Sequence, residues 1–304
     1  MSDLRVTPKT LTEKQVHKFD DDGFLIGLPA ISAEEARQFR AELEAAEADR
    51  GESSNAFLLE GHTRWPFMHK LATSPAILDA VEDLIGPNLL IWDAQAFVKE
   101  PRTPSFVSWH QDTNYWGLDP DDGIVTAWVA LSDVTAANGP MEFLRGSHLE
   151  PVRPQEDTYE GTNMLSRGQE IVWEKPIDPN EVHQVILAPG QFSLHHVRLA
   201  HKSGPNQGSD RRIGIAIRFM PPHVRPVLGQ DCAMLVRGED PYGHFLSEVA
   251  PKAADDPEAV RQYERTRRMK AENYMQDADQ KRGEERARAV AEVNVPAHLR
   301  AAKL

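Results

Sequence analysis

The sequence is poor in cysteine: Cys232 is the only one among 304 residues. A single cysteine cannot form a disulfide within the chain, so a disulfide-stabilised secreted scaffold is excluded. Long apolar runs are also missing, whereas a membrane-spanning helix needs roughly 18 or more consecutive apolar residues. The N-terminal stretch MSDLRVTPKTLTEKQ lacks the apolar segment of a secretory signal. We therefore expect a cytoplasmic protein without a membrane partner.

Positive charge is also scarce. Lysine and arginine total 34 against 47 acidic residues, a formal net charge of −13. This balance argues against a general nucleic-acid binder or a partner of anionic membranes, and it leaves a small molecule as the expected partner. The last three residues, Ala302-Lys303-Leu304, resemble a peroxisomal address of the S-K-L type, so a peroxisomal location is the alternative.

Helix signals occur at both ends of the chain. Two capping boxes, Thr12 with Gln15 and Ser32 with Glu35, each predict a helix start. The stretch SPAILDAVEDLIGP predicts a third helix, with Ser74 as its cap and a Gly-Pro pair as its end. The tail is rich in both charges and favours a solvated amphipathic helix. These signals place the N-terminal helices within about 10–87 and the C-terminal helical segment within about 255–293.

Between these ends the chain has short β-type runs separated by turn residues. Because no helices intervene, the runs favour an antiparallel sandwich or barrel over a βαβ sheet. No linker or internal repeat is visible, so we expect one domain over 1–304 with its β core at about 89–225. The runs are 89–99, 106–110, 124–131, 141–144, 185–187, 191–196 and 212–220.

The stretch SWHQDTNYW, residues 108–116, contains a histidine and an aspartate two positions apart. In a strand such residues project from one face, so His110 and Asp112 can present an imidazole and a carboxylate to one point. One further histidine completes the two-nitrogen, one-oxygen set that suits non-haem Fe(II) and leaves coordination positions open. His201 is the natural third ligand, although composition alone also admits His148, His195 and His196.

Alternate residues of the predicted strand that starts at Arg211 point to opposite faces of the sheet. Isoleucines at alternate positions form an apolar stripe that fits the core, and Arg212 lies on the opposite face with Gly214, Ala216 and Arg218. The Arg212 guanidinium could therefore bind a carboxylate ligand bidentately, or it could form an ordinary buried ion pair. Arg211 is expected to face solvent or a salt bridge.

The sequence resembles the phytanoyl-CoA dioxygenase family of Fe(II)- and 2-oxoglutarate-dependent oxygenases, from LTEKQVHKFDDDGFLI to about RFMPP. The likeness includes FVKEP, WHQD..YW, VTAWVALSDVTAANGP, GSH and H.SGPN followed by an arginine. It implies a mainly β fold with flanking helices, the double-stranded β-helix (a cupin-like jelly roll). It also implies that His110, Asp112 and His201 bind iron, and that Arg212 holds the distal carboxylate of 2-oxoglutarate.

The resemblance implies further roles. Trp128 and Ser203 are expected to line the co-substrate pocket, and Gln95 to make another co-substrate contact. The expected activity uses Fe(II), 2-oxoglutarate and O2, hydroxylates or otherwise oxidises an unactivated C–H of a small organic molecule, and releases succinate and CO2. Halogenating relatives have a small residue at the position of Asp112, so this carboxylate indicates oxygen transfer. One departure is Arg145 before GSH, where the family more often has proline.

The substrate is less clearly marked. Tyr115, Trp116, Phe143 and Arg218 could line its cavity or belong to the core. In the family, residues 150–185 often form part of the entrance, and here they hold eight acids against three bases. An acidic rim would repel the phosphates of an acyl-CoA, which favours a neutral or cationic small molecule. The alternatives are an acyl-CoA 2-hydroxylase of the phytanoyl-CoA type, a zinc-dependent hydrolase with the same ligands, and a non-catalytic jelly-roll binding protein.

Overall fold

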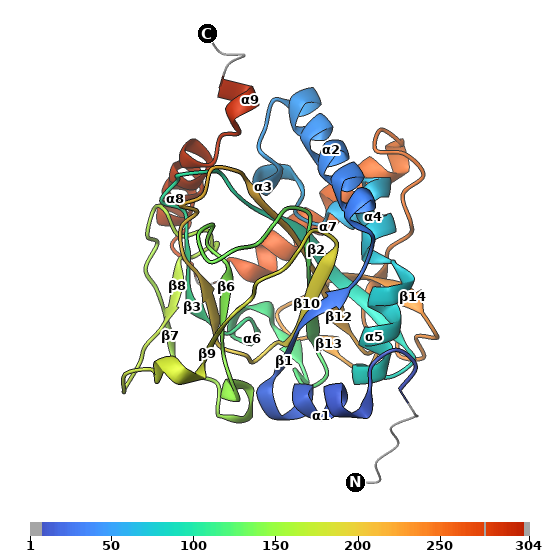
Figure 1. Ribbon diagram of the computed structural model, residues 1–304. Coiled ribbons are helices and arrows are strands. Elements are labelled where there is room, and N and C mark those ends of the chain that lie inside the picture. The colour runs from blue at the N-terminus through green and yellow to red at the C-terminus, as the bar shows by residue number, and fades with distance from the viewer. Residues whose placement is uncertain (1–7, 277, 301–304) are drawn as a thin grey trace.

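The computed structural model describes residues 8–276 and 278–300, and its centre is a pair of facing β-sheets (Figure 1). The motif Ala302-Lys303-Leu304 lies outside the described residues. The larger sheet has seven strands in the order β1-β10-β5-β12-β2-β14-β15, and the smaller has four in the order β3-β11-β6-β9. Neighbouring strands in these sheets are antiparallel except for β14 and β15. Such a sandwich fits the predicted double-stranded β-helix.

The strands have the following bounds. Those of the larger sheet are β1 (Phe24–Pro29), β2 (Leu89–Lys99), β5 (Val125–Ala130), β10 (Gln191–His196), β12 (Arg212–Met220), β14 (Cys232–Arg237) and β15 (Leu246–Ser247). Those of the smaller sheet are β3 (Val107–His110), β6 (Met141–Leu144), β9 (Val182–Gln184) and β11 (His201–Ser203). Two further pairs are β4 (Leu118–Asp119) with β13 (Arg225–Pro226), and β7 (Gln155–Asp157) with β8 (Gln169–Ile171).

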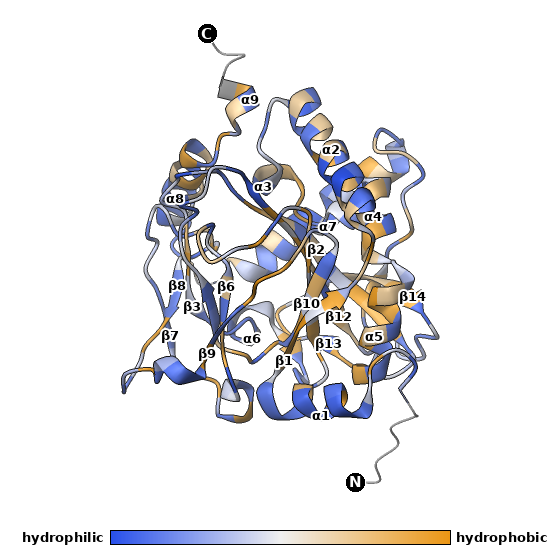
Figure 2. Ribbon diagram, viewed as in Figure 1, coloured by the Kyte–Doolittle hydropathy of each residue, from blue (hydrophilic) through white to orange (hydrophobic). Residues whose placement is uncertain are grey.

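Helices cover the outer face of the larger sheet, on the right in Figure 1. They include α2 (Ala33–Arg50), α4 (Pro66–Ala72) and α5 (Pro75–Ile85), with α1 (Glu13–Asp22) near one end of the sheet. The apolar stripe predicted for β12 joins the core on this side: Ile213, Ile215 and Ile217 are fully buried with α2 and α5 side chains. Burial of each such side chain stabilises the fold by about 1.5–3 kcal/mol. In Figure 2, hydrophobic residues are concentrated around β12 and on α5, whereas α1 is largely hydrophilic.

Most predicted elements are present, with two corrections. Both capping boxes form. Ser74 occupies the predicted N-cap position of α5, but its hydroxyl donates to the carbonyl of Ala30 and makes no capping hydrogen bond. The predicted run 185–187 is not a strand, because β9 lies just before it at Val182–Gln184. The sequence did not predict β1, β11 and β14, because these strands are fixed by pairing with neighbours distant in the chain and lack a strong local pattern.

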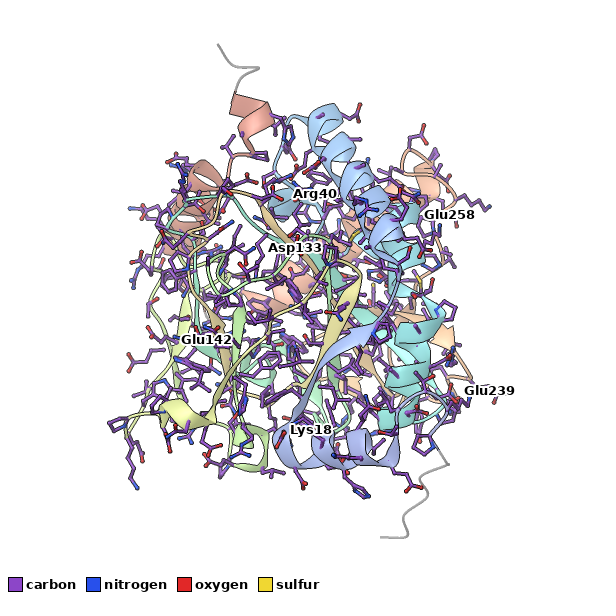
Figure 3. All side chains as sticks on the ribbon, in the orientation of Figure 1. Lys18, Arg40, Asp133, Glu142, Glu239 and Glu258 are labelled. Atoms are coloured by element: carbon purple, nitrogen blue, oxygen red, sulfur yellow. The ribbon has the colours of Figure 1, made fainter. Side chains whose placement is uncertain are left out.

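The tail differs most from expectation. Instead of one solvated helix, α7 (Pro257–Tyr274), α8 (Gln280–Val293) and α9 (Ala297–Arg300) fold back against the sandwich, and residues of all three line its internal cavity. Some of their charged residues face outward, as Figure 3 shows for Glu258. Lys270 and Arg286 instead line the cavity, together with small and apolar residues of α8 that include Gly283, Ala287 and Val290. The remaining short elements are α3 (Ser54–Phe57), α6 (Thr113–Trp116), η1 (Gly61–Thr63), η2 (Ser147–Leu149) and η3 (Pro179–Glu181).

Among the residues that the structure describes, no helix combines the length and apolar character that a membrane crossing would require.

Candidate metal centre and co-substrate pocket

The structure brings His110, Asp112 and His201 together between the two sheets. His110 ends β3 and lies opposite His201 on the neighbouring strand β11, with ring centroids 4.0 Å apart. One ligand atom from each of the three side chains lies within 4.8 Å of the others, and all three residues are buried. The geometry therefore offers two imidazole nitrogens and one carboxylate oxygen to a single point.

Asp112 reaches this point by a route that strand alternation did not predict. β3 ends at His110, and Asp112 has helical backbone angles at the start of α6. The turn is held by Gln111, whose side chain donates to the carbonyl of Arg198 and accepts from the backbone N–H of Arg153. As a result, the Asp112 carboxylate comes within 3.3 Å of Nε2 of His110.

Backbone carbonyls orient both imidazoles. Nδ1 of His110 lies 2.9 Å from the carbonyl of Ser108, and Nδ1 of His201 lies 2.9 Å from that of Leu199. Because a carbonyl only accepts, each Nδ1 must carry the proton, and each Nε2 keeps a lone pair for a metal.

The protonation states also fit a metal site. Burial and the neighbouring His110 lower the pKa of His201 to about 4, so its ring is neutral at physiological pH. Burial alone would raise the pKa of Asp112, but the adjacent His110 imidazole, 3.3 Å away, outweighs it together with His201 and the Arg218 guanidinium, and the pKa is held below its usual range. Neutral imidazoles and an ionised carboxylate are the forms that bind metal, and this donor set fits Fe(II).

The other histidines that composition admitted as a third metal ligand do not belong to the three-residue cluster. His195, on β10, lines the same cavity with its ring centroid 4.8 Å from that of His201. Burial and the nearby His201 hold the pKa of His195 well below its usual range, so it is a neutral neighbour of the site. His148 and His196 pack against each other, 5.3 Å apart, and neither lines the cavity formed by the described residues.

Two buried cationic residues lie next to each other, and one of them, Arg212, lines the cavity. Arg212 on β12 is opposite Lys99 on β2, and their exposures are 1% and 0%. Arg212 donates only to the carbonyls of Gly139 and Phe97, at 3.3 and 3.5 Å, and no described carboxylate pairs with it. Burial alone lowers the pKa of Arg212 to about 10, so the group remains cationic. The predicted inward orientation of Arg212 is therefore present, and the alternative of an ordinary ion pair is not.

Lys99 is a site residue that analysis of the sequence missed. Its ammonium donates to the Ser203 hydroxyl at 2.6 Å and to the carbonyls of Ser203 and Gly204. Burial and the charge of Arg212 hold the pKa of Lys99 well below its usual range. The signal was available, because Lys99 is the lysine of FVKEP and ends a strand of clear alternation.

Trp128 supports the arginine. Its ring lies under the Arg212 guanidinium, 5.1 Å from centroid to Cζ, and Ser203 lines the same cavity. The ring crosses Gly214 so closely that a Cβ built there would come within 1.7 Å of it. Only glycine at 214 therefore allows Trp128 to occupy this place. Arg211, in contrast, is buried in ion pairs with Glu44, Glu47 and Glu100, so its predicted solvent exposure was wrong and its predicted salt bridge correct.

The other predicted pocket residues divide into two groups. Tyr115, Trp116 and Arg218 line a cavity of about 900 Å³ that also contains the metal cluster. Gln95 lines it too, but its amide oxygen accepts from the Arg218 guanidinium, so it lies beside Arg218 and not beside Arg212. Phe143 is fully buried behind the site, packed on His195 and His201. It is not among the described cavity-lining residues, so of its two predicted places, cavity or core, it takes the core.

The acidic stretch 150–185 does not form the wall we expected. Its contribution to the cavity lining is Met164, Leu165 and Ser166, and none of its eight acids is included. Asp157, for example, pairs with Arg167 instead. The acids that do line the cavity, apart from the metal cluster, are Glu52, Glu60, Asp93, Asp231 and Glu284.

Comparison with known proteins agrees with this geometry. The family model described as phytanoyl-CoA dioxygenase matches residues 19–214. The chain is 30% identical over 172 residues to a probable alpha-ketoglutarate-dependent hypophosphite dioxygenase of Stutzerimonas stutzeri, covering 55% of this chain and 58% of that protein. It is 29% identical over 157 residues to the peroxisomal phytanoyl-CoA dioxygenase of Bos taurus, covering 50% and 45%. The match thus spans about half the length of these curated relatives.

Solved structures extend the likeness. The non-heme monooxygenase ThoJ superposes with a TM-score of 0.75 at 35% identity, over 90% of this chain and 98% of that one. CytC3 with Fe(II) and alpha-ketoglutarate, at 22% identity, shares the fold with a TM-score of 0.60 over 81% and 99%. These matches confirm the predicted jelly-roll class, and enzymes of this group use Fe(II), 2-oxoglutarate and O2. The chain belongs to the phytanoyl-CoA dioxygenase family.

Proposed function

We propose that the protein is an Fe(II)- and 2-oxoglutarate-dependent dioxygenase that hydroxylates a C–H bond of a small organic molecule. The observation that carries the proposal is the coexistence of a buried His-Asp-His cluster and the buried Arg212 in one cavity, with the buried Lys99 opposite Arg212 on the neighbouring strand. Iron held by the cluster would supply O2 activation, using the two electrons released when 2-oxoglutarate loses CO2 and becomes succinate. One oxygen atom enters succinate and the other enters the substrate.

The chain's own residues have distinct tasks in this reaction. His110, Asp112 and His201 would hold the metal on one face and leave positions for ligands. Lys99 and Arg212 would bind the distal carboxylate of 2-oxoglutarate, since a buried cation pair requires a compensating anion. Walls drawn from both sheets and from the C-terminal helices keep water from the reacting groups.

The cation pair also distinguishes this function from the alternatives. A zinc-dependent hydrolase could use the same three ligands, but it would have no task for Lys99 and Arg212. A non-catalytic binding protein would have no need of open metal positions. Asp112 supports oxygen transfer, because the carboxylate takes the coordination position that a halide would need.

An anaerobic titration tests the metal and co-substrate assignment. Addition of Fe(II) and 2-oxoglutarate should produce a weak visible charge-transfer band, which a zinc hydrolase would not show. In air, a screen that reads succinate should include coenzyme A thioesters beside free acids, amines and neutral molecules. Preference for a coenzyme A thioester would favour the acyl-CoA 2-hydroxylase, in line with the activity named for the bovine relative. Absence of both the band and succinate would contradict the proposed function.

We further propose that residues 1–304 act as a single catalytic domain in the cytoplasm. The single cysteine supports a reducing compartment. Fluorescent tagging at the N-terminus, with and without the last three residues, tests the peroxisomal alternative: only a peroxisomal protein would change location.

A further inference from the structure

The cavity has a second charged region, far from Lys99 and Arg212. A β-bulge interrupts the pairing of β2 with β12 between Arg218 and Phe219, and it turns both Trp92 and Asp93 toward the cavity. Asp93 lies opposite Arg218, six residues along β12 from Arg212. At about 3.3 Å per residue, the two regions are separated by about 20 Å.

Most charges in this second region are paired. Asp93 forms an ion pair with Arg218, and Asp231 lies 3.2 Å from the ammonium of Lys270. Both acids and both cations line the cavity. Each of these carboxylates therefore has its own compensating cation.

Glu60 is the exception. This residue lines the cavity with 5% exposure, and within the part of the chain that the structure describes its Oε2 atom has no hydrogen-bond partner. Its backbone φ of 60° is in the left-handed region, which is uncommon for a residue other than glycine. A buried carboxyl oxygen without a hydrogen-bond partner is costly, so a ligand that donates to Oε2 would stabilise the protein.

The charged neighbours of Glu60 come from several elements. They are Asp93 on β2, Lys270 on α7 and Glu248 just after β15, and Glu248 in turn lies 3.3 Å from Nε2 of His62. Burial, together with the nearby Asp93, raises the pKa of Glu60 well above its usual range, although Lys270 opposes the shift. This shift favours the neutral acid in the free protein. A cation placed beside it would favour the carboxylate and release a proton.

The aromatic surroundings also suit a cation. Trp92 and Trp116 pack with ring centroids 4.9 Å apart. The Lys270 ammonium lies 3.9 Å from the Trp92 ring, and the Arg218 guanidinium lies 5.1 Å from the Trp116 ring. Tryptophan faces attract cations through the ring quadrupole.

We propose that the substrate carries a positively charged nitrogen, and that Glu60, with Asp93 beside it, binds that group at the end of the cavity opposite the Lys99–Arg212 pair. The inference deepens the proposed function and rests on it. The dianionic co-substrate and the cationic substrate would then occupy opposite ends of one cavity. Arg218 links the substrate end to the metal, because it pairs with Asp93 and its charge also acts on Asp112.

Equilibrium binding tests the proposal without turnover. We would titrate the anaerobic Fe(II)–2-oxoglutarate protein by calorimetry with a panel of primary ammonium compounds, each matched to an alcohol and a carboxylate of the same carbon skeleton. We expect the ammonium members to bind roughly tenfold or more tightly than their partners, as a charge-assisted hydrogen bond provides. Their binding should also release a proton, seen as a dependence of the heat on the buffer.

Two variants make the result specific. Glu60→Gln mimics the neutral acid, so it should fold normally while losing both the ammonium preference and the proton release. Glu284→Gln is the matched control, an exposed acid that also lines the cavity, and it should keep both. No ammonium binding, tighter binding of alcohols or carboxylates, or an unchanged preference in Glu60→Gln would overturn the proposal. Failure of the proposed function would be distinguished from failure of this substrate proposal, because only the former would remove the charge-transfer band.

Discussion

Lys99 and Arg212 lie directly opposite each other on β2 and β12, both fully or almost fully buried. Two like charges this close destabilise the folded protein unless an anion lies between them or one group loses its proton. The lowered pKa of Lys99 is the expected consequence in the ligand-free protein. A dicarboxylate would relieve this electrostatic cost, so the two residues that we propose as its binding site would also link its binding to stability.

Arg212→Gln should raise the concentration of 2-oxoglutarate needed for half-maximal succinate formation by roughly 10- to 100-fold, the loss expected for a charged hydrogen-bond partner. The rate at saturating 2-oxoglutarate should change less, because the metal ligands are intact. Arg225→Gln is the control, since Arg225 is exposed and pairs with Asp119 at the surface. Equal effects of the two variants would show that Arg212 does not bind the co-substrate.

Binding of 2-oxoglutarate should weaken as pH rises. Burial and Arg212 hold the pKa of Lys99 low in the free protein, so Lys99 loses its proton at a lower pH than an exposed lysine. A bound carboxylate stabilises the ammonium, and binding above that lowered pKa must therefore take up a proton. Affinity is then highest below the free-state pKa of Lys99 and falls as pH rises through it.

Calorimetry in two buffers of different ionisation enthalpy measures the proton uptake directly. Lys99→Met should bind 2-oxoglutarate more weakly and should lose the proton uptake linked to this group. A wild-type pH profile that stays flat, or one that Lys99→Met leaves unchanged, would contradict the assignment.

Asp112→Ala should abolish succinate formation and the anaerobic charge-transfer band. Removal of the carboxylate leaves only two imidazoles, which hold Fe(II) too weakly for the chemistry. Asp119→Asn, at an exposed position, should retain both signals. Circular dichroism of Asp112→Ala should match that of the wild type, and turnover at the wild-type rate would refute the ligand assignment.

The strands that could be predicted are those whose own residues show the pattern. β2, β6, β10 and β12 match the predicted ranges because each has apolar or alternating side chains and a turn at its ends. β11 is three residues long and is fixed by its pairing with β3 and β6, so no local signal marks it. Its first residue, His201, could be identified only through the family motif.

The site shows the same limit. Asp112 joins the predicted cluster for a different reason than expected, since a turn and not strand alternation aims its carboxylate. The acids at 150–185 were expected at the entrance because the family often places this stretch there, but none of them lines the cavity. Glu60 and Asp93, which do line it, are isolated acids in apolar segments. The tail was expected to be solvated because its composition is charged, yet its few apolar and small residues fall on the face that closes the cavity. Composition does not reveal which side of a helix meets the rest of the protein.

Tyr274, at the end of α7, tests the role of that tail. Its ring stacks on Tyr115 with centroids 6.1 Å apart, and its hydroxyl accepts a 2.8 Å hydrogen bond from Nε2 of Gln169. Burial raises its pKa to about 12, so the phenol stays neutral. Tyr274→Ala should lower the free energy of unfolding by about 1–3 kcal/mol, as expected for loss of a partly buried ring. The same variant should also admit water to the cavity, so the enzyme should be inactivated faster during turnover without organic substrate. Tyr274→Phe should be inactivated at the wild-type rate. The matched control is Tyr242→Ala, which removes an exposed tyrosine that also stacks on a neighbouring ring. If Tyr274→Ala is inactivated no faster than this control, α7 does not shield the reacting groups.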